Sequence, residues 1–276
     1  MLGAAEVGGQ ARRHEVIARR NSTLDSAARS QAIFPHSEAF VNEPLEKSAR
    51  QHVGDNPRWS RRFTFNQYLV TDQEPLLFHS GPRRMFPLVR EAVGRVLPPE
   101  RLRYIGLSHF EADECGSLNE WLAVAPSAVP VCGRIAALVS INDVADRPAR
   151  ALSDGEVLSL GTHSVRWFDT PHLPHAWECG FLLETRTRTL LCGDLFTQGG
   201  TDHPPLTEAD ILGPSEAFRG PMDYFAHAKN TRGMLERLAA EQPATLACMH
   251  GSAWRGDGAY LLRALADALD RHEAPS

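Results

Sequence analysis

Residues 103–114 read RYIGLSHFEADE and place three potential metal ligands directly after an apolar stretch. The stretch from Arg103 to Ser108 predicts a short strand, and His109, Glu111 and Asp113 follow it at alternate positions. In an extended segment, residues two apart project to the same side, so these side chains can converge on one point or bracket two adjacent points. Burying such carboxylates without a counter-charge is costly, and a bound cation removes that cost. The segment is therefore a candidate corner of a metal site.

Three further ligand-type residues stand at the ends of apolar stretches. His175 follows one such stretch, Asp194 comes directly after residues 190–193 (LLCG), and His250 comes directly after residues 247–249 (ACM). Each of these patterns is weak alone, because a single His or Asp after a strand usually faces solvent or caps a turn. Their ordered combination favours a metal centre. Asp194 could bridge two metal ions, because a carboxylate has two oxygens.

Strands and helices alternate along most of the chain, which predicts a mixed α/β (α+β) fold. Alternating and continuous apolar runs predict strands over residues 63–70, 75–79, 103–108, 129–131, 156–160, 164–169, 179–184, 189–192 and 245–249. Helical spacing predicts helices over residues 87–96, 118–123, 133–139, 222–238 and 259–269. No internal repeat is evident.

Length and composition limit the kinds of protein this can be. The 276 residues, 42% of them hydrophobic, suit one large domain, and the net charge of -5 argues against a nucleic-acid partner. No run of about 18 apolar residues predicts a membrane span, and no secretory signal is recognisable. The five cysteines are odd in number and show no CxxC spacing, which favours free thiols in the reducing cytoplasm.

The N-terminal part differs in pattern from the rest. Residues 1–58 have little apolar periodicity, and we expect them to form a poorly ordered or irregular extension. Residues 59–276 are expected to form the domain.

The four strand-end sites together resemble the metallo-β-lactamase superfamily. The matching segments are Ser108–Glu114, Asp169–His175, Cys192–Asp194 and Met249–Gly251, and the resemblance covers about residues 62–270. It implies an αββα sandwich.

Glu111 stands where the hydrolases of this superfamily have a histidine, and this resembles the diiron branch of flavodiiron proteins and oxygen-binding diiron proteins. Zinc hydrolase sites favour neutral imidazole, which leaves positive charge to acidify a bound water. An added carboxylate lowers the site charge and suits harder, more oxidised iron. The resemblance thus implies two non-haem iron ions, with zinc or manganese as the alternative. We expect no flavin in this chain.

The resemblance also implies a set of ligands, and no catalytic side chain beyond them. The first metal would take His109, Glu111, His175 and the bridging Asp194, and the second would take Asp113, Asp194, His250 and Glu114. Glu114 stands where the family has a histidine, so its role as a ligand is left open. We prefer His175 over His172 because it lies six residues before Phe181, the spacing of the family ligand.

The expected function is binding of O2 or NO, with reduction or sensing of the gas, in a pocket walled by Phe110, His172 and Trp177. His79, Phe196, His203 and Trp254 are weaker candidates for lining this pocket, and a structural role is favoured for each. Catalytic reduction would need a separate electron donor. The resemblance leaves a homodimer open: flavodiiron proteins often pair head to tail so that the flavin of one chain meets the irons of another, and that reason is absent without a flavin. The alternative is a metal-dependent hydrolase of an ester, lactone, thioester or phosphodiester. A metal-stabilised interaction protein ranks last.

Overall fold

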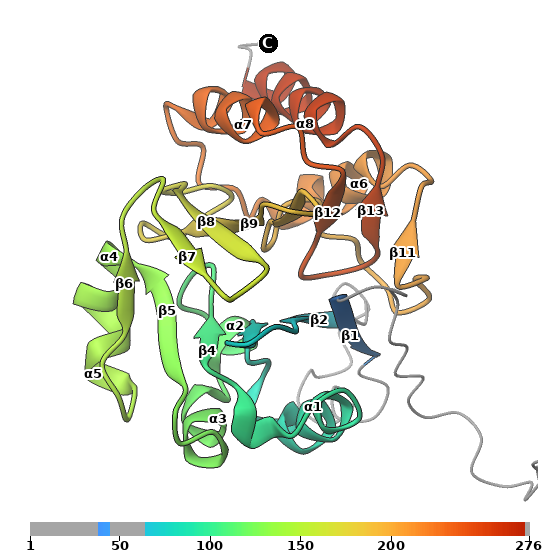
Figure 1. The fold of residues 1–276 in the computed structure, drawn as a ribbon. Coiled ribbons are helices and arrows are strands. Elements are labelled where there is room, and N and C mark those ends of the chain that lie inside the picture. The colour runs from blue at the N-terminus through green and yellow to red at the C-terminus, as the bar shows by residue number, and fades with distance from the viewer. Residues whose placement is uncertain (1–37, 45–63, 274–276) are drawn as a thin grey trace, which may run out of the picture.

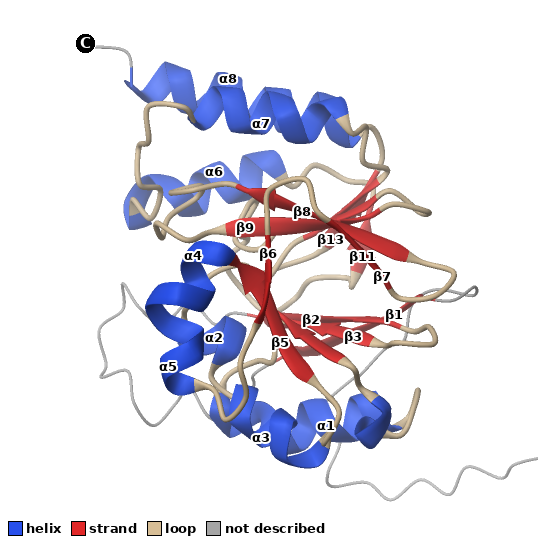
Figure 2. Ribbon diagram, turned by 60° about the vertical axis from the view of Figure 1, so that its left-hand side comes forward, coloured by secondary structure: helices blue, strands red, loops and turns tan. Residues whose placement is uncertain are grey.

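Two β-sheets lie face to face with helices on both outer sides, as Figures 1 and 2 show. The computed structural model describes residues 38–44 and 64–273. This arrangement is the αββα sandwich that the sequence resemblance implies, so the expected fold is confirmed. No helix within the described residues is long and apolar enough to cross a membrane.

The first sheet is antiparallel at one edge and parallel across the rest. Its strands, in spatial order, are β1 (Glu38–Pro44), β2 (Thr64–Val70), β3 (Leu76–Phe78), β4 (Tyr104–Gly106), β5 (Val129–Gly133) and β6 (Arg150–Leu152). The helices that follow these strands are α1 (Phe86–Gly94), α2 (Ala112–Cys115), α3 (Leu118–Val124), α4 (Arg134–Ala136) and α5 (Asn142–Val144). A π-helical turn, Ala137–Ile141, joins α4 to α5.

Within the part of the chain that the structure describes, the second sheet contains seven strands. In spatial order they are β11 (Leu206–Thr207), β13 (Ala253–Arg255), β12 (Thr245–Ala247), β10 (Thr189–Leu191), β9 (Gly180–Glu184), β8 (Ser164–Asp169) and β7 (Val157–Ser159). Its outer face carries α6 (Leu212–Met222), α7 (Thr231–Ala240) and α8 (Gly258–Glu273).

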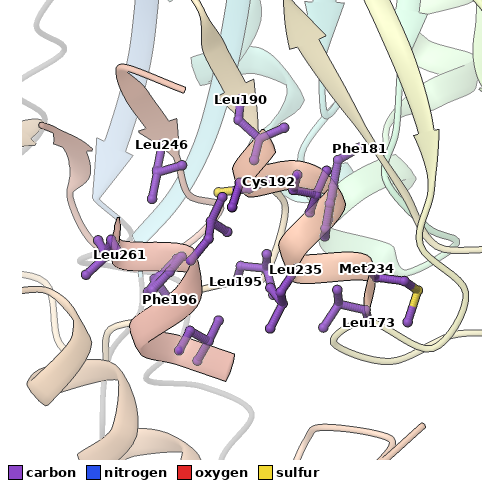
Figure 3. Packing of buried hydrophobic residues seen from close by; sticks show 14 of the residues in the cluster. Leu173, Phe181, Leu190, Cys192, Leu195, Phe196, Met234, Leu235, Leu246 and Leu261 are labelled. Atoms are coloured by element: carbon purple, nitrogen blue, oxygen red, sulfur yellow. The ribbon is translucent and has the colours of Figure 1, made fainter. Parts of the chain in front are cut away.

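Among the described residues, three apolar clusters hold the four layers together. One lies between the sheets, where Phe78 of β3 and Trp167 of β8 are fully buried. A second lies between the first sheet and its helices and contains Trp121. The third lies between the second sheet and α6 to α8, and Figure 3 shows Phe196 and Leu235 packed within it. Each sheet therefore buries both faces, which explains the almost uninterrupted apolar runs of its central strands.

Two local predictions are corrected by the structure. The helix expected over residues 222–238 is wrong, because α6 ends at Met222 and α7 begins only at Thr231. Between them Asp223 and His227 adopt positive φ, which a helix cannot contain. Within the N-terminal extension, residues 38–44 form β1, a strand that we did not expect. The rest of residues 1–58 lies outside the described residues.

Candidate metal centre

Four strands, one from the first sheet and three from the second, lead into the segments that carry the ligand-type side chains. β4 leads to His109, and the short helix α2 then carries Asp113 and Glu114 in its first turn. β8 leads to the loop of His175. β10 and β12 are parallel neighbours paired through Leu191 and Ala247, so the residues that follow them, Asp194 and His250, also lie side by side.

His109, Glu111 and His175 form one half of the cluster. The Nε2 atoms of His109 and His175 lie 3.0 Å apart. Glu111 Oε1 lies 3.1 Å from His175 Nε2 and 3.8 Å from His109 Nε2. The Glu111 side chain is 50% exposed, so this half faces solvent.

Asp113, Glu114 and His250 form the other half. His250 Nε2 lies 3.3 Å from Asp113 Oδ2. Glu114 is fully buried, and its Oε2 lies 3.9 Å from His109 Nε2. Ligand atoms of Asp113, Glu114 and His250 all fall within 4.8 Å of one another, the spacing of a potential cation site.

Asp194 joins the two halves. Its Oδ2 lies 3.6 Å from His109 Nε2 and 3.4 Å from His175 Nε2, whereas its Oδ1 lies 3.4 Å from His250 Nε2. The two oxygens of one carboxylate therefore face different halves, as a bridging ligand requires.

Two of the three histidines are oriented by backbone carbonyls. His175 Nδ1 lies 3.1 Å from the carbonyl oxygen of Tyr224, and His250 Nδ1 lies 2.8 Å from that of Thr64. A carbonyl only accepts hydrogen bonds, so in each ring Nδ1 carries the proton. In its neutral form each ring therefore presents the Nε2 lone pair to the cluster, as a metal-binding histidine does.

The donor set matches what a pair of cations requires. Both oxygens of Glu114 and Oδ1 of Asp194 are buried and lack a hydrogen-bond partner among the described residues. Buried polar atoms are rarely left in that state, and a bound ion would give these oxygens the partner that they need. Glu111, Asp113, Glu114 and Asp194 carry four negative charges when ionised, which two divalent cations would neutralise.

The pKa values express the same crowding of charge. Burial raises the pKa of Glu114 well above its usual range, and the neighbouring Asp194 and Asp113 raise it further. Burial alone would raise the pKa of Asp194, but its contacts with His250, His109 and His175 outweigh burial and lower it. For His250, burial is outweighed by Asp113 and Asp194, which raise its pKa to about 10.

The residues expected to wall a pocket lie at the surface. Phe110, His172 and Trp177 are all exposed, and no potential cation site among the described residues includes His172. The structure therefore brings His175, and not His172, into the cluster. Phe110 and Glu111 line a surface hollow of about 490 Å³ that extends towards Val144. Among the described cluster residues, Glu111 alone lines this hollow.

The sequence analysis missed the groups that lie behind the histidines. His79, expected at most to line a pocket, is fully buried and contacts Ser108, which in turn contacts His109. The carbonyls of Tyr224 and Thr64 come from segments 49 and 186 residues distant from the histidines they meet. The local sequence offered one sign of these contacts, a polar serine, Ser108, at the end of the apolar run directly before His109.

Known proteins resemble the chain over most of its described length. It is 25% identical over 193 residues to the putative diflavin flavoprotein A 1 of Nostoc sp., covering 68% of this chain and 33% of that protein. It is 24% identical over 204 residues to the rubredoxin-oxygen oxidoreductase of Megalodesulfovibrio gigas, covering 70% of this chain and 50% of the relative. The chain thus spans a third to a half of the length of these relatives.

The fold is also that of known crystal structures. The flavodiiron protein from Giardia intestinalis superimposes with a TM-score of 0.68 and 18% identity, covering 88% of this chain and 60% of that one. A model of the family described as ODP family beta lactamase matches residues 63–251. These matches confirm the predicted resemblance to the metallo-β-lactamase superfamily and its flavodiiron branch. Because the family match covers more than half of the sequence, this chain belongs to the ODP family of beta lactamases.

Proposed function

We propose that the cluster holds two iron ions and that the protein binds O2. His109, Glu111 and His175 would hold the first ion, and Asp113, Glu114 and His250 the second, with Asp194 between them. The observation that carries the proposal is the fully buried Glu114, whose two oxygens lack hydrogen-bond partners among the described residues. A carboxylate in that position is explained by a cation that it binds.

The donor chemistry supports iron over zinc. Structural and catalytic zinc sites rely mainly on His and Cys, whereas carboxylate-rich sites suit harder cations. All five cysteines are buried and free, and the potential cation sites among the described residues contain only His, Asp and Glu. Iron is therefore proposed, and zinc or manganese is the result that would contradict it.

The protein's own groups would orient and expose the centre. The carbonyls of Tyr224 and Thr64 hold the rings of His175 and His250 with Nε2 towards the cluster. The hollow lined by Glu111 would bring a small ligand to that carboxylate. When bound, the metal pair would supply the redox chemistry for O2.

The relatives support O2 as the ligand, because one of them is named rubredoxin-oxygen oxidoreductase. NO, a separate electron donor and a homodimer remain predictions for this chain. Reduction of O2 over many turnovers would require that separate donor, whereas binding or sensing of O2 would not.

Metal analysis combined with optical spectroscopy tests the proposal. The protein is reconstituted with ferrous iron without oxygen, its iron and zinc content is measured, and its spectrum is recorded before and after O2. We expect about two iron ions per chain and an absorption change on adding O2. Two zinc ions per chain with no response to O2 would contradict the proposal and favour the hydrolase alternative.

A pair of variants in one loop provides the matched control. His175→Ala removes a proposed ligand, so we expect it to lose iron and the O2 response. His172→Ala changes an exposed neighbour in the same loop and should keep both. Equal losses in the two variants would contradict the proposed ligand set.

A further inference from the structure

A row of buried polar groups lies behind His109, on the side away from the cluster. Met249 Sδ lies 3.0 Å from His79 Nδ1, His79 Nε2 lies 3.0 Å from Ser108 Oγ, and Ser108 Oγ lies 2.9 Å from His109 Nδ1. His79, Ser108 and His109 are fully buried, so they depend on one another for hydrogen bonds. Gly193 permits this packing, because a side chain there would come within 3.0 Å of Ser108 Oγ.

The direction of each hydrogen bond follows from the end of the row. A thioether sulfur only accepts hydrogen bonds, so His79 Nδ1 must carry a proton and donate a hydrogen bond to Met249 Sδ. A neutral His79 then has a bare Nε2, which accepts the hydroxyl proton of Ser108. Because the hydroxyl proton of Ser108 is then directed to His79, Ser108 Oγ can only accept a hydrogen bond from His109. His109 Nδ1 therefore carries a proton. The Nε2 lone pair of His109 consequently faces the cluster.

This order requires His79 to be uncharged. His79 is fully buried, and the two groups that contact its ring nitrogens, Met249 and Ser108, are themselves uncharged. Burial lowers the pKa of His79 to about 3. Its backbone has a φ of +65° and its ring stacks on Phe78, with centroids 4.2 Å apart, so the ring is held in place.

We propose that His79 is a positioning residue, which fixes His109 in the tautomer whose Nε2 lone pair points to the metal site. The proposal rests on the proposed role of His109 as a ligand. His109 differs here from His175 and His250, whose Nδ1 atoms meet carbonyls that can only accept. A serine hydroxyl can donate as well as accept, so Ser108 alone would allow either tautomer of His109. His79 removes that freedom.

Replacing His79 tests the proposal in the protein without metal. In His79→Phe, Ser108 is free to donate to His109 Nδ1, and the proton of His109 should move to Nε2. Nitrogen NMR of protein labelled with 15N-histidine distinguishes the two tautomers, and a pH titration identifies the neutral form. His79→Gln should restore the original tautomer, because its amide oxygen can accept from Ser108 while its NH2 group donates to Met249.

Iron affinity gives a second measurement. Loss of a group behind a metal-binding histidine typically weakens metal binding about 10- to 100-fold, and we expect a change of that size in His79→Phe with partial recovery in His79→Gln. His163→Phe is the matched control, because His163 is also buried but pairs with Glu184 outside the cluster. It should leave the tautomer of His109 and the iron affinity unchanged.

Met249→Leu provides a milder test in case His79→Phe does not fold. It keeps nearly the same volume but removes the acceptor that fixes the row, so it should shift His109 towards the other tautomer. An unchanged nitrogen spectrum of His109 in Met249→Leu and in any folded His79→Phe would overturn the proposal. If instead the tautomer shifts as expected but even the unaltered protein binds no iron, the positioning role stands and the proposed function fails.

Discussion

The two halves of the cluster contain similar ligands, but their glutamates lie in opposite surroundings. In one half the Glu111 side chain is 50% exposed, whereas in the other half the Glu114 side chain is fully buried. Water can solvate Glu111 when no metal is bound, but Glu114 has no such substitute. The buried half therefore needs its cation to neutralise the charge of Glu114. The exposed half is where we expect a small ligand to bind. Variants that remove one half or the link between them test this division.

Asp194 is the residue whose loss should have the largest effect, because its two oxygens face both halves. In Asp194→Asn one oxygen becomes an NH2 group, which cannot bind a cation. We expect the iron content to fall from about two per chain towards zero. Iron affinity should fall by more than about 100-fold, the largest loss typical when a group that only supports a ligand is removed. Metal analysis after equilibrium dialysis measures this.

Asp169→Asn is a suitable control for Asp194→Asn. Asp169 also ends a strand of the second sheet, but its Oδ1 accepts a hydrogen bond from Trp167 and it lies outside the cluster. It should retain both iron ions. Retention of two ions by Asp194→Asn would show that the halves bind independently and that Asp194 is no bridge.

Glu114→Gln should remove the ion of the buried half only, leaving about one iron per chain. Without metal the same variant should be more stable than the unaltered protein, by about 1–2 kcal/mol at neutral pH, because a neutral amide avoids the free-energy cost of ionising a buried carboxyl group beside Asp194 and Asp113. Chemical unfolding of the metal-free proteins measures the difference. A Glu114→Gln protein that keeps two iron ions would leave Glu114 without a role as a ligand.

The pH dependence of Glu114 can be compared with that of Glu184, another buried glutamate. The pKa of Glu114 is raised in the folded protein, so its contribution to stability is fully present below the ordinary value of 4.5 and is lost as pH rises. Burial alone would raise the pKa of Glu184, but hydrogen bonds from Thr187, Arg186 and His163 lower it. Its contribution is therefore present above the ordinary value and is lost as pH falls. Glu184→Gln should thus destabilise at neutral pH, where Glu114→Gln stabilises.

The metal-site residues were easier to predict from the sequence than the groups that orient them. His109, Asp194 and His250 each follow an apolar strand directly, so local pattern and strand topology suffice to bring them together. The supporting contacts depend on the tertiary fold. The carbonyl of Thr64, which orients His250, lies 186 residues away, and nothing in the local sequence marks a carbonyl as an acceptor for a distant ring.

The mispredicted helix has a related cause. The apolar spacing continues through residues 222–238, but Phe225 is buried in the core beside α7 and His175 needs the carbonyl of Tyr224. Both contacts require the chain to leave the helical path between α6 and α7. Local periodicity cannot register that requirement, because the partner loop around His175 lies far away in the sequence.

Glu111→His should have the smallest effect, because Glu111 is the most exposed member of the cluster and water can take its place. The change exchanges a carboxylate for an imidazole and removes one negative charge, so the preference should move from iron towards zinc by roughly tenfold, or about 1.4 kcal/mol. Competition between the two metals, measured as the Fe/Zn ratio, gives the result. Glu120→His places an imidazole in the same hollow outside the cluster and should leave the ratio unchanged. An unchanged Fe/Zn ratio in Glu111→His would mean that the buried half sets the metal preference. The two halves would then differ even more, and the argument that the Glu111 carboxylate favours iron would be wrong.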